Sequence, residues 1–307
     1  MMDKCVFIHT NERQWLGALV AEYSLRRNSR HAQQFDVRFI HTRDHPFLAA
    51  REGQRFLRGG TSRVWRMDDL QSFTPLRFAA PQLMNWQGRA VVIDPDVFAV
   101  GDIYDLLTRD MGAAAVMGRH RSGRAEKGYQ VATSVMLMDC ARLAHWDVEQ
   151  EFGQLFRGEK DYKEWMVLAY EDPAHIGYLE DYWNDFDHLD ANTRLLHNTK
   201  RRTQPWKTGL PVDFTPADKF KDKPVLASLN RMRAGLFGEY ALLGRYREHP
   251  DRAQEQFFFG LLKECLACGH VSEALVRAEM RNNHVRHDAF EVLERTPDLA
   301  KLPVKAA

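Results

Sequence analysis

Apolar and polar positions in the first part of the chain follow two different repeats. Residues 5–10 form a short apolar run rich in strand-forming side chains, and residues 15–25 then place apolar side chains at helical spacing. A second strand-like run over residues 35–42 ends in the same four residues as the first, Phe-Ile-His-Thr. A strand, a helix and a strand in this order predict a βαβ unit, and a βαβ unit implies a parallel sheet.

The middle of the chain continues to alternate between strand and helix patterns. The elements that we expect there are a helix over 51–56 that Gly59-Gly60 ends, a strand over 63–67, a helix over 74–86, and strands over 89–94, 113–117 and 134–138. Alternation of this kind predicts an α/β fold with a mainly parallel central sheet flanked by helices. Ligands of such sheets gather beyond the carboxyl ends of the strands.

The pattern changes after Pro224. Residues 254–266, 271–280 and 287–293 carry helical spacing, and Gly269-His270 ends the first of these helices. We therefore expect two units, a ligand-binding α/β domain over residues 1–225 and a helical C-terminal extension over residues 226–307.

Charge and composition exclude several classes of protein. The chain has 43 Lys and Arg against 42 Asp and Glu, a net charge of +1, so bulk charge selects no nucleic-acid partner. With 44% hydrophobic residues it has the material for a buried core. Four scattered cysteines favour a reducing compartment. Neither a signal peptide nor an apolar run of about 18 residues is found, which predicts a cytoplasmic protein with no transmembrane segment.

Candidate chemistry begins with Asp94-Pro95-Asp96, which directly follows the strand expected over residues 89–94. Carboxylates two positions apart on a strand point to opposite faces, but a proline turn can bring both to one point. Carboxylate oxygens are the ligands of hard divalent cations such as Mg²⁺ and Mn²⁺, which commonly join a carboxylate to a diphosphate. An ordinary Asp-Pro turn without a metal is the alternative.

Several motifs recur in the order of a known family. They are Phe7-Ile8-His9-Thr10-Asn11-Glu12, Leu76-Arg77-Phe78, residues 93–103 with Asp94-Pro95-Asp96 and Gly101-Asp102-Ile103, Thr133 through Asp139, and His197 through Trp206. In these residues the sequence resembles the GT-A fold glycosyltransferases over about residues 4–210. It is most similar to glycosyltransferase family 8, which includes glycogenin and bacterial lipopolysaccharide galactosyl- and glucosyltransferases.

The resemblance implies a metal-dependent enzyme with a GT-A (Rossmann-like) fold. Such an enzyme moves a hexose from a nucleotide-diphosphate sugar, usually a UDP-sugar, to a carbohydrate or glycolipid acceptor with retention at the anomeric carbon. Asp94, Asp96 and His197 would hold Mn²⁺ or Mg²⁺, and an imidazole beside two carboxylates suits Mn²⁺ better.

The resemblance also implies the residues around that metal. Thr10 and Asn11 would lie by the base and ribose, and Arg77 would contact sugar or phosphate. Basic clusters at residues 119–127 and 200–207 would supply positive charge to the diphosphate. The phosphate-binding candidates are Lys207 and its neighbours Lys200, Arg201 and Arg202. For the acceptor-side Asp-Gln pair of the family, the nearest candidates are Asp161 and Glu164.

The sequence departs from the family pattern at Ala132, Ser134, Lys200 and Gln204. These changes keep a second hypothesis open, a catalytically impaired protein that binds a nucleotide sugar or a partner. A third hypothesis is a phosphatase of the haloacid-dehalogenase type, because Val-Val-Ile-Asp-x-Asp also matches the first motif of that class, with Asp94 as nucleophile and Asp96 as acid/base.

Overall fold

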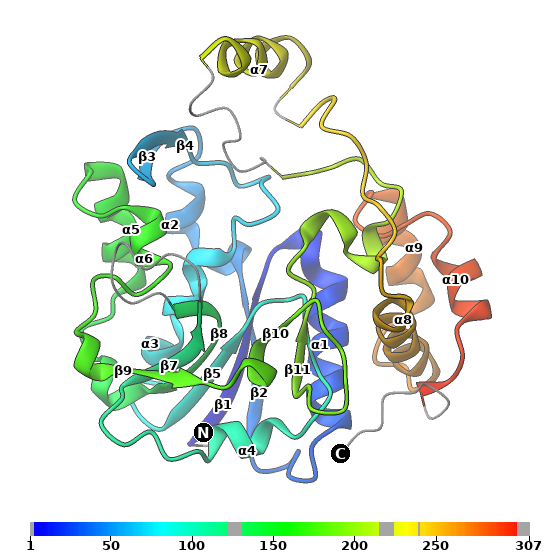
Figure 1. The fold of residues 1–307 in the computed structure, drawn as a ribbon, viewed down its shortest axis with the longest axis horizontal. Helices are drawn as coiled ribbons and strands as arrows, with labels where there is room; N and C mark the ends of the chain where they lie inside the picture. Colours follow the sequence, from blue (N-terminus) through cyan, green and yellow to red (C-terminus); the bar gives the residue numbers. More distant parts are fainter. Residues whose placement is uncertain (1–2, 122–130, 215–223, 239, 300–307) are drawn as a thin grey trace.

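A six-stranded sheet forms the centre of the computed structural model, which describes residues 3–121, 131–214, 224–238 and 240–299 (Figure 1). Its strand order is β2 (Asp36–His41), β1 (Lys4–Thr10), β5 (Arg89–Ile93), β8 (Val131–Asp139), β7 (Val116–His120) and β9 (Ile176–Leu179). Only β8 among these six strands runs against the others. The expected α/β class with a mainly parallel sheet is therefore confirmed.

The first three expected elements, a strand, a helix and a strand, are present. β1 pairs in parallel with β2, and α1 (Trp15–Arg27) connects them, so the βαβ prediction is confirmed. β1 also pairs in parallel with β5. The carboxyl ends of β1 and β5 thus lie side by side, which places Asn11 and Asp94 at the same edge of the sheet.

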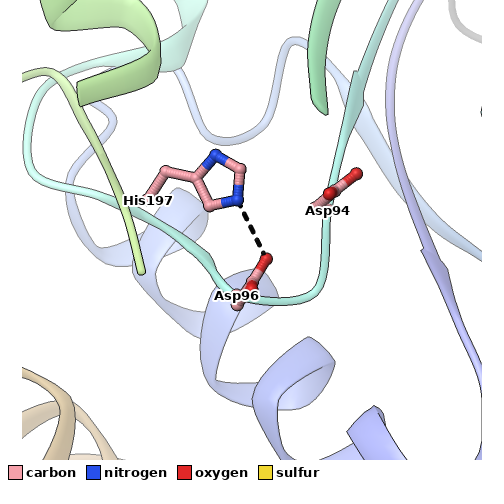
Figure 2. A group of neighbouring side chains, drawn as sticks. All are labelled: Asp94, Asp96 and His197. Carbon is pink, nitrogen blue, oxygen red and sulfur yellow. Dashed lines mark ion pairs between the residues drawn. The ribbon is translucent and has the colours of Figure 1, made fainter. Parts of the chain in front are cut away.

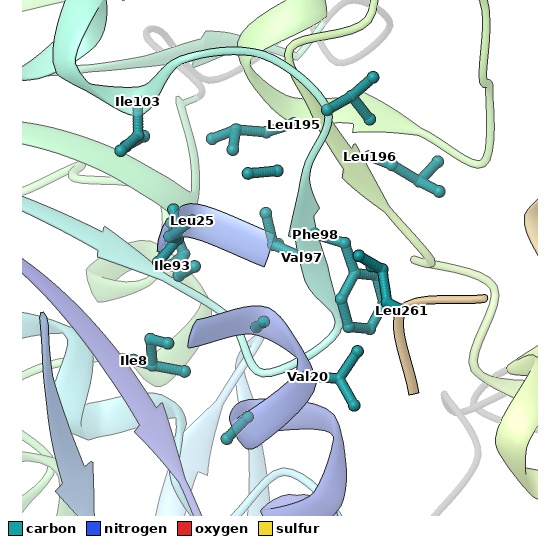
Figure 3. Close-up of a cluster of buried hydrophobic side chains, with 14 of the residues drawn as sticks. Ile8, Val20, Leu25, Ile93, Val97, Phe98, Ile103, Leu195, Leu196 and Leu261 are labelled. Atoms are coloured by element: carbon teal, nitrogen blue, oxygen red, sulfur yellow. The ribbon is translucent and has the colours of Figure 1, made fainter. Parts of the chain in front are cut away.

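The inner strands β1, β5 and β8 are buried on both faces, which explains their nearly continuous apolar runs. Along β1, Val6 and Ile8 point into one hydrophobic cluster while Cys5 and Phe7 point into the other, as the two-residue period of a strand requires. The first cluster packs the sheet against α1 and the second sheet (Figure 3). The fold is therefore a sheet between two layers of other elements.

A second sheet, of three strands, carries His197. Its order is β10 (Asp185–Phe186), β11 (Leu195–His197) and β6 (Val97–Ala99). β6 and β11 are antiparallel, and His197 lies opposite Val97. This register sets His197 against the turn that joins β5 to β6.

The helix expected over residues 51–56 is wrong. The chain forms a hairpin there, β3 (Arg55–Arg58) and β4 (Thr61–Val64), joined by Gly59 and Gly60. Both glycines have positive φ, +61° and +71°, which suits a two-residue hairpin turn. The glycine pair therefore joins two strands instead of ending a helix.

The remaining helices cover the sheet and fill the C-terminal part. In the first 165 residues they are α2 (Pro46–Ala49), α3 (Ala80–Leu83), α4 (Ile103–Leu107), α5 (Val148–Arg157) and α6 (Tyr162–Trp165). The helix expected over 74–86 is only partly confirmed, because a 3-10 turn, Thr74–Phe78, precedes α3.

The C-terminal helices are α7 (Pro224–Phe237), α8 (Arg252–Ala267), α9 (Glu273–Arg281) and α10 (Ala289–Arg295). α8 buries Phe258 and Leu261 in the same cluster as β1 and α1. The division at residues 225 and 226 stays a prediction. Across the part of the chain that the structure describes, no helix is both long enough and apolar enough to cross a membrane.

Candidate metal centre

Three buried side chains from separate segments meet beyond the ends of β1 and β5. Asp94 follows β5, Asp96 lies in the turn to β6, and His197 ends β11 (Figure 2). One ligand atom of each lies within 4.8 Å of the others, and all three residues are buried. The structure thus brings together the three residues for which the sequence predicted metal binding.

The backbone explains this convergence. The Asp94 amide donates to the Ser134 carbonyl at 2.9 Å, and the Asn198 amide donates to the Asp96 carbonyl at 3.1 Å. The turn is therefore tied on one side to β8 and on the other to the end of β11. Proline at the middle of the turn removes a donor and restricts φ, so the strand cannot continue.

Helix α1 packs directly against this turn at Gly17. A Cβ atom built on Gly17 would lie 2.7 Å from the Pro95 carbonyl oxygen, a separation that real Cβ atoms essentially never show. A glycine inside a helix ordinarily destabilises it by about 1 kcal/mol relative to alanine. Here the missing side chain lets the turn approach the helix.

Asp94 is held by two basic side chains. Arg77 Nη2 donates to Asp94 Oδ1 at 2.7 Å and to Oδ2 at 3.0 Å, and His9 Nε2 lies 2.8 Å from Oδ1. Burial alone would raise the pKa of Asp94, but Arg77 and His9 lower it to about 2. Burial also lowers the pKa of His9, so its imidazole is neutral at neutral pH. Asp94 is therefore ionised across the physiological range.

His9 is a site residue that the sequence prediction missed. It lies on β1, is fully buried, and points at Asp94. Its only sequence signal was membership of the repeated Phe-Ile-His-Thr, and His41 occupies the equivalent place on β2. A neutral histidine can hold the carboxylate without adding charge.

Asp96 has one satisfied oxygen and one unsatisfied one. Gln204 Nε2 donates to Asp96 Oδ2 at 2.8 Å, whereas Oδ1 is buried without a hydrogen-bond partner among the described residues. His197 Nε2 lies 3.3 Å from that oxygen. Buried polar atoms are nearly always paired, so an unpaired carboxylate oxygen marks a place for a proton or a cation.

Asn184 fixes the proton on His197. Asn184 Nδ2 donates to Ser134 Oγ at 2.9 Å, which turns Asn184 Oδ1 toward His197 Nδ1 at 2.8 Å. Nδ1 therefore carries a proton, and the lone pair of a neutral ring is on Nε2, the atom that faces Asp96. Burial opposes protonation, but the nearby Asp96 and Asp94 carboxylates outweigh it and raise the pKa of His197, so protons would compete with a cation for Nε2.

The donor set fits a divalent cation. Two carboxylates and the Nε2 lone pair offer oxygen and nitrogen ligands, and a neighbouring group orients the histidine through its other nitrogen, as in known metal sites. A second acidic group, Asp185 with His188 and Asp190, has ligand atoms equally close together. There Thr193 already donates to Asp185, and His188 is exposed. We therefore take the buried group as the candidate centre.

Thr10 ends β1, and Asn11 follows it at the same edge of the sheet. The side-chain Nδ2 of Asn11 donates to the carbonyls of Asp69 and Leu70 and, at 2.9 Å, to Ser72 Oγ. Asn11 Oδ1 is buried and has no hydrogen-bond partner in the described part of the chain. Nucleotide contact by these two residues stays a prediction.

Lys207 and Lys200 do not share one environment. The fully buried Lys207 Nζ donates to Asp213 Oδ2 at 2.9 Å. Burial lowers the pKa of Lys207 although Asp213 opposes the shift. Lys200 is exposed, and its backbone amide donates to Asp187 at 3.2 Å. Lys207 is thus already paired, and its phosphate role stays a prediction, as does that of Lys200.

Asp161 is the N-cap of α6 and Glu164 lies within that helix, beside the β3–β4 hairpin. Asp161 accepts hydrogen bonds from the amides of Gly59 and Gly60, both at 2.8 Å, and from the Lys163 amide at 2.7 Å. Glu164 accepts from the Tyr170 hydroxyl at 2.9 Å. In this structure Asp161 clamps the hairpin to α6, and acceptor contact by either residue stays a prediction.

The basic cluster at residues 119–127 is described only in part. Arg119 donates to Asp181 at 2.8 Å and to the Asn184 carbonyl at 2.7 Å, so it braces the segment that carries Asn184. Arg124 and Lys127 lie outside the described residues.

No family model and no curated protein matches the sequence. Among solved structures, the chain is similar to the glycosyltransferase GlyE of Streptococcus pneumoniae, with 16% identity and a TM-score of 0.46 over 66% of this chain. The match spans 55% of GlyE, about half of its length. The galactosyltransferase LgtC, in complex with donor and acceptor sugar analogues, matches with 12% identity and a TM-score of 0.46 over 66% of this chain and 89% of LgtC. Similarity at this level says nothing of what this chain binds or catalyses.

Proposed function

We propose that the chain is a metal-dependent glycosyltransferase that uses a nucleotide-diphosphate sugar as donor. The observation that carries the proposal is the buried group of Asp94, Asp96 and His197, in which one carboxylate oxygen has no hydrogen-bond partner among the described residues. The group lies where ligands of parallel α/β sheets bind, beyond the carboxyl ends of β1 and β5.

The chain's own residues prepare this centre for a cation. Arg77 and His9 keep Asp94 ionised, Gln204 fixes one oxygen of Asp96, and Asn184 orients His197. A divalent cation bound there would neutralise the charge that develops on a departing diphosphate. Such local neutralisation lets a chain of net charge +1 hold a diphosphate without a basic surface.

Finer features of the proposal rest on the sequence resemblance. They are Mn²⁺ as the cation, UDP as the nucleotide, a hexose as the transferred group, a carbohydrate or glycolipid as acceptor, and retention at the anomeric carbon. Thr10 and Asn11 would contact the nucleoside, because they lie at and just after the end of the strand that pairs with the one before Asp94. Lys200 and Lys207 would contact phosphate, and Asp161 and Glu164 would lie on the acceptor side.

Binding of UDP and GDP, followed by calorimetry with and without Mn²⁺, tests the proposal. Wild-type protein is expected to bind one nucleotide only when Mn²⁺ is present. Asp96→Asn, which keeps the side-chain volume but removes the charge, is expected to lose the metal-dependent part. Asp190→Asn, a matched change in the other acidic group, is expected to bind as wild type.

Turnover then separates the three hypotheses. Slow release of UDP from a UDP-hexose in the presence of Mn²⁺ identifies an active transferase. Metal-dependent nucleotide binding without any such release identifies a binding protein. Release of inorganic phosphate from simple phosphate esters, lost in Asp94→Asn, identifies a phosphatase and contradicts the proposal.

A further inference from the structure

Two arginines near the candidate metal centre have no counter-ion among the described residues. They are Arg58, at the tip of the β3–β4 hairpin in the upper left of Figure 1, and Arg201, in the 3-10 turn Arg201–Thr203. Both residues are partly buried. Neither side chain makes an ion pair or a hydrogen bond with another described residue. Buried charges in proteins are ordinarily paired, so two such cations mark a place where an anion can bind.

An aromatic ring holds each of the two guanidinium groups. The Arg58 guanidinium carbon lies 4.6 Å from the ring centre of Tyr162, and that of Arg201 lies 4.8 Å from the ring centre of Phe214. A ring face attracts a cation, but it does not neutralise the charge, and it leaves the N–H groups at the edge of the guanidinium free. The two arginines are therefore positioned and still have hydrogen-bond donors to offer.

Both arginines are connected to the residues of the metal centre. Arg201 stands three residues before Gln204, whose side chain donates to a carboxylate of the centre. The ring under Arg58 belongs to Tyr162, and its hydroxyl is hydrogen-bonded to the hydroxyl of Thr74. Thr74 begins the 3-10 turn that carries Arg77, which donates to the other carboxylate. Two short series of contacts thus lead from the arginines to the centre.

The two arginines are also close enough to repel each other. Burial lowers the pKa of Arg201, and the positive charge of Arg58 lowers it further, although Asp69 and Asp96 oppose the shift. Arginine stays protonated in proteins, so this repulsion is present at neutral pH. An anion bound between the two guanidinium groups would relieve the repulsion and accept hydrogen bonds from both.

The position of Arg58 favours the acceptor over the donor as the source of this anion. The two glycines that follow Arg58 donate to Asp161, the N-cap of α6, and Tyr162 is the first residue of that helix. The proposed function puts Asp161 on the acceptor side. A divalent cation at the metal centre would already offset the charge of the donor diphosphate. The two arginines therefore supply positive charge that the donor does not need.

We propose that Arg58 and Arg201 bind an anionic group of the acceptor, either a phosphate or a carboxylate. This inference rests on the proposed transferase function. It narrows the acceptor from any carbohydrate or glycolipid to one that carries a negative charge. Both guanidinium groups present a fork of N–H donors that matches the oxygens of such a group. A neutral acceptor would leave the two charges without a partner.

Calorimetric titration of the chain, loaded with Mn²⁺ and UDP, with three sugars tests the proposal. Glucose 6-phosphate supplies a phosphate, glucuronate supplies a carboxylate, and glucose supplies neither. One of the two anionic sugars is expected to bind at least about tenfold more tightly than glucose, and it identifies the group. Arg58→Gln and Arg201→Gln are each expected to weaken that binding about tenfold or more. Arg55→Gln, the same change at an exposed arginine of the same hairpin, is expected to bind as wild type.

The affinity for UDP in the presence of Mn²⁺ separates this inference from the proposed function. Absence of UDP binding by wild type contradicts the transferase function. UDP binding without binding of either anionic sugar contradicts this inference alone, and so does equal binding of all three sugars. Arg58→Gln is expected to bind UDP as wild type does. If it loses as much affinity for UDP as for the anionic sugar, the arginines serve the donor and the proposal is wrong. Thermal unfolding of each variant shows whether it is folded.

Discussion

Replacing Asn184 by leucine is expected to weaken Mn²⁺ binding although Asn184 contacts no metal. Asn184 is fully buried, and its Oδ1 lies 2.8 Å from His197 Nδ1. Leucine has nearly the same size and cannot accept this hydrogen bond. His197 then has two options: a buried N–H without a partner, or a shift of the proton to Nε2, the nitrogen that must be free to bind a cation.

Both options are expected to weaken Mn²⁺ binding by a similar amount. An unsatisfied buried donor costs about 1–3 kcal/mol. Loss of a group that orients a metal ligand typically lowers metal affinity about 10- to 100-fold, which corresponds to about 1.4–2.7 kcal/mol. We therefore expect the dissociation constant of Mn²⁺ to rise by about 10- to 100-fold in Asn184→Leu.

Asn184→Asp is the matched control. A carboxylate can still accept from His197 Nδ1, and the Ser134 hydroxyl can donate to its other oxygen, so Mn²⁺ affinity is expected to stay near that of wild type or to increase. Titration of each protein with Mn²⁺, with the free ion followed by electron paramagnetic resonance, gives the affinities. Equal affinities of wild type and Asn184→Leu, or equally weak binding by both variants, would refute the proposed role of Asn184.

Three further predictions concern the turn, the buried ion pair and the proton on His197. Gly17→Ala should lower both stability and Mn²⁺ affinity, because the added Cβ meets the Pro95 carbonyl at 2.7 Å; a gain in melting temperature with unchanged affinity would contradict this. Asp213→Asn should destabilise the protein by about 3 kcal/mol at neutral pH, because it leaves Lys207 buried without its counter-charge. Burial alone would raise the pKa of Asp213, but Lys207 lowers it. The stabilisation that the ionised Asp213 gives should therefore be present above pH about 4 and fade as the pH falls. Urea unfolding at several pH values measures it, and a difference between the two proteins that does not shrink in acid would count against it. The pKa of His197 is raised, so protons should compete with Mn²⁺ for Nε2 and Mn²⁺ affinity should fall as the pH drops; titrations at several pH values, with calorimetry in buffers of different ionisation enthalpy, check this, and an affinity that does not change with pH would contradict it.

Local patterns made the central sheet predictable. The runs that became β1 and β5 are apolar on both faces, and this signature of buried strands needs no tertiary information. The hairpin at Gly59-Gly60 was misread because a glycine pair ends helices and also joins strands. The backbone amides of both glycines donate to Asp161, which lies about 100 residues away in sequence, so this support for the turn carries no local signal.

For the candidate centre, too, the sequence revealed local motifs but not contacts between distant segments. Asp94 and Asp96 are neighbours in sequence, and the family resemblance added His197. His9 and Asn184 join the site through contacts across the fold, and neither carries a local signal that distinguishes it from a structural residue. Gln204 had been read as a departure from the family pattern, and the structure shows that its amide contacts Asp96 directly.

Anomalous diffraction from crystals soaked with Mn²⁺ and UDP tests the central claim most directly. The account predicts one Mn²⁺ peak within coordination distance, about 2.0–2.3 Å, of an oxygen of Asp94, an oxygen of Asp96 and His197 Nε2. It also predicts that the diphosphate of UDP contacts the same ion. Nucleotide bound elsewhere, or no peak between these three side chains at saturating Mn²⁺, would contradict it.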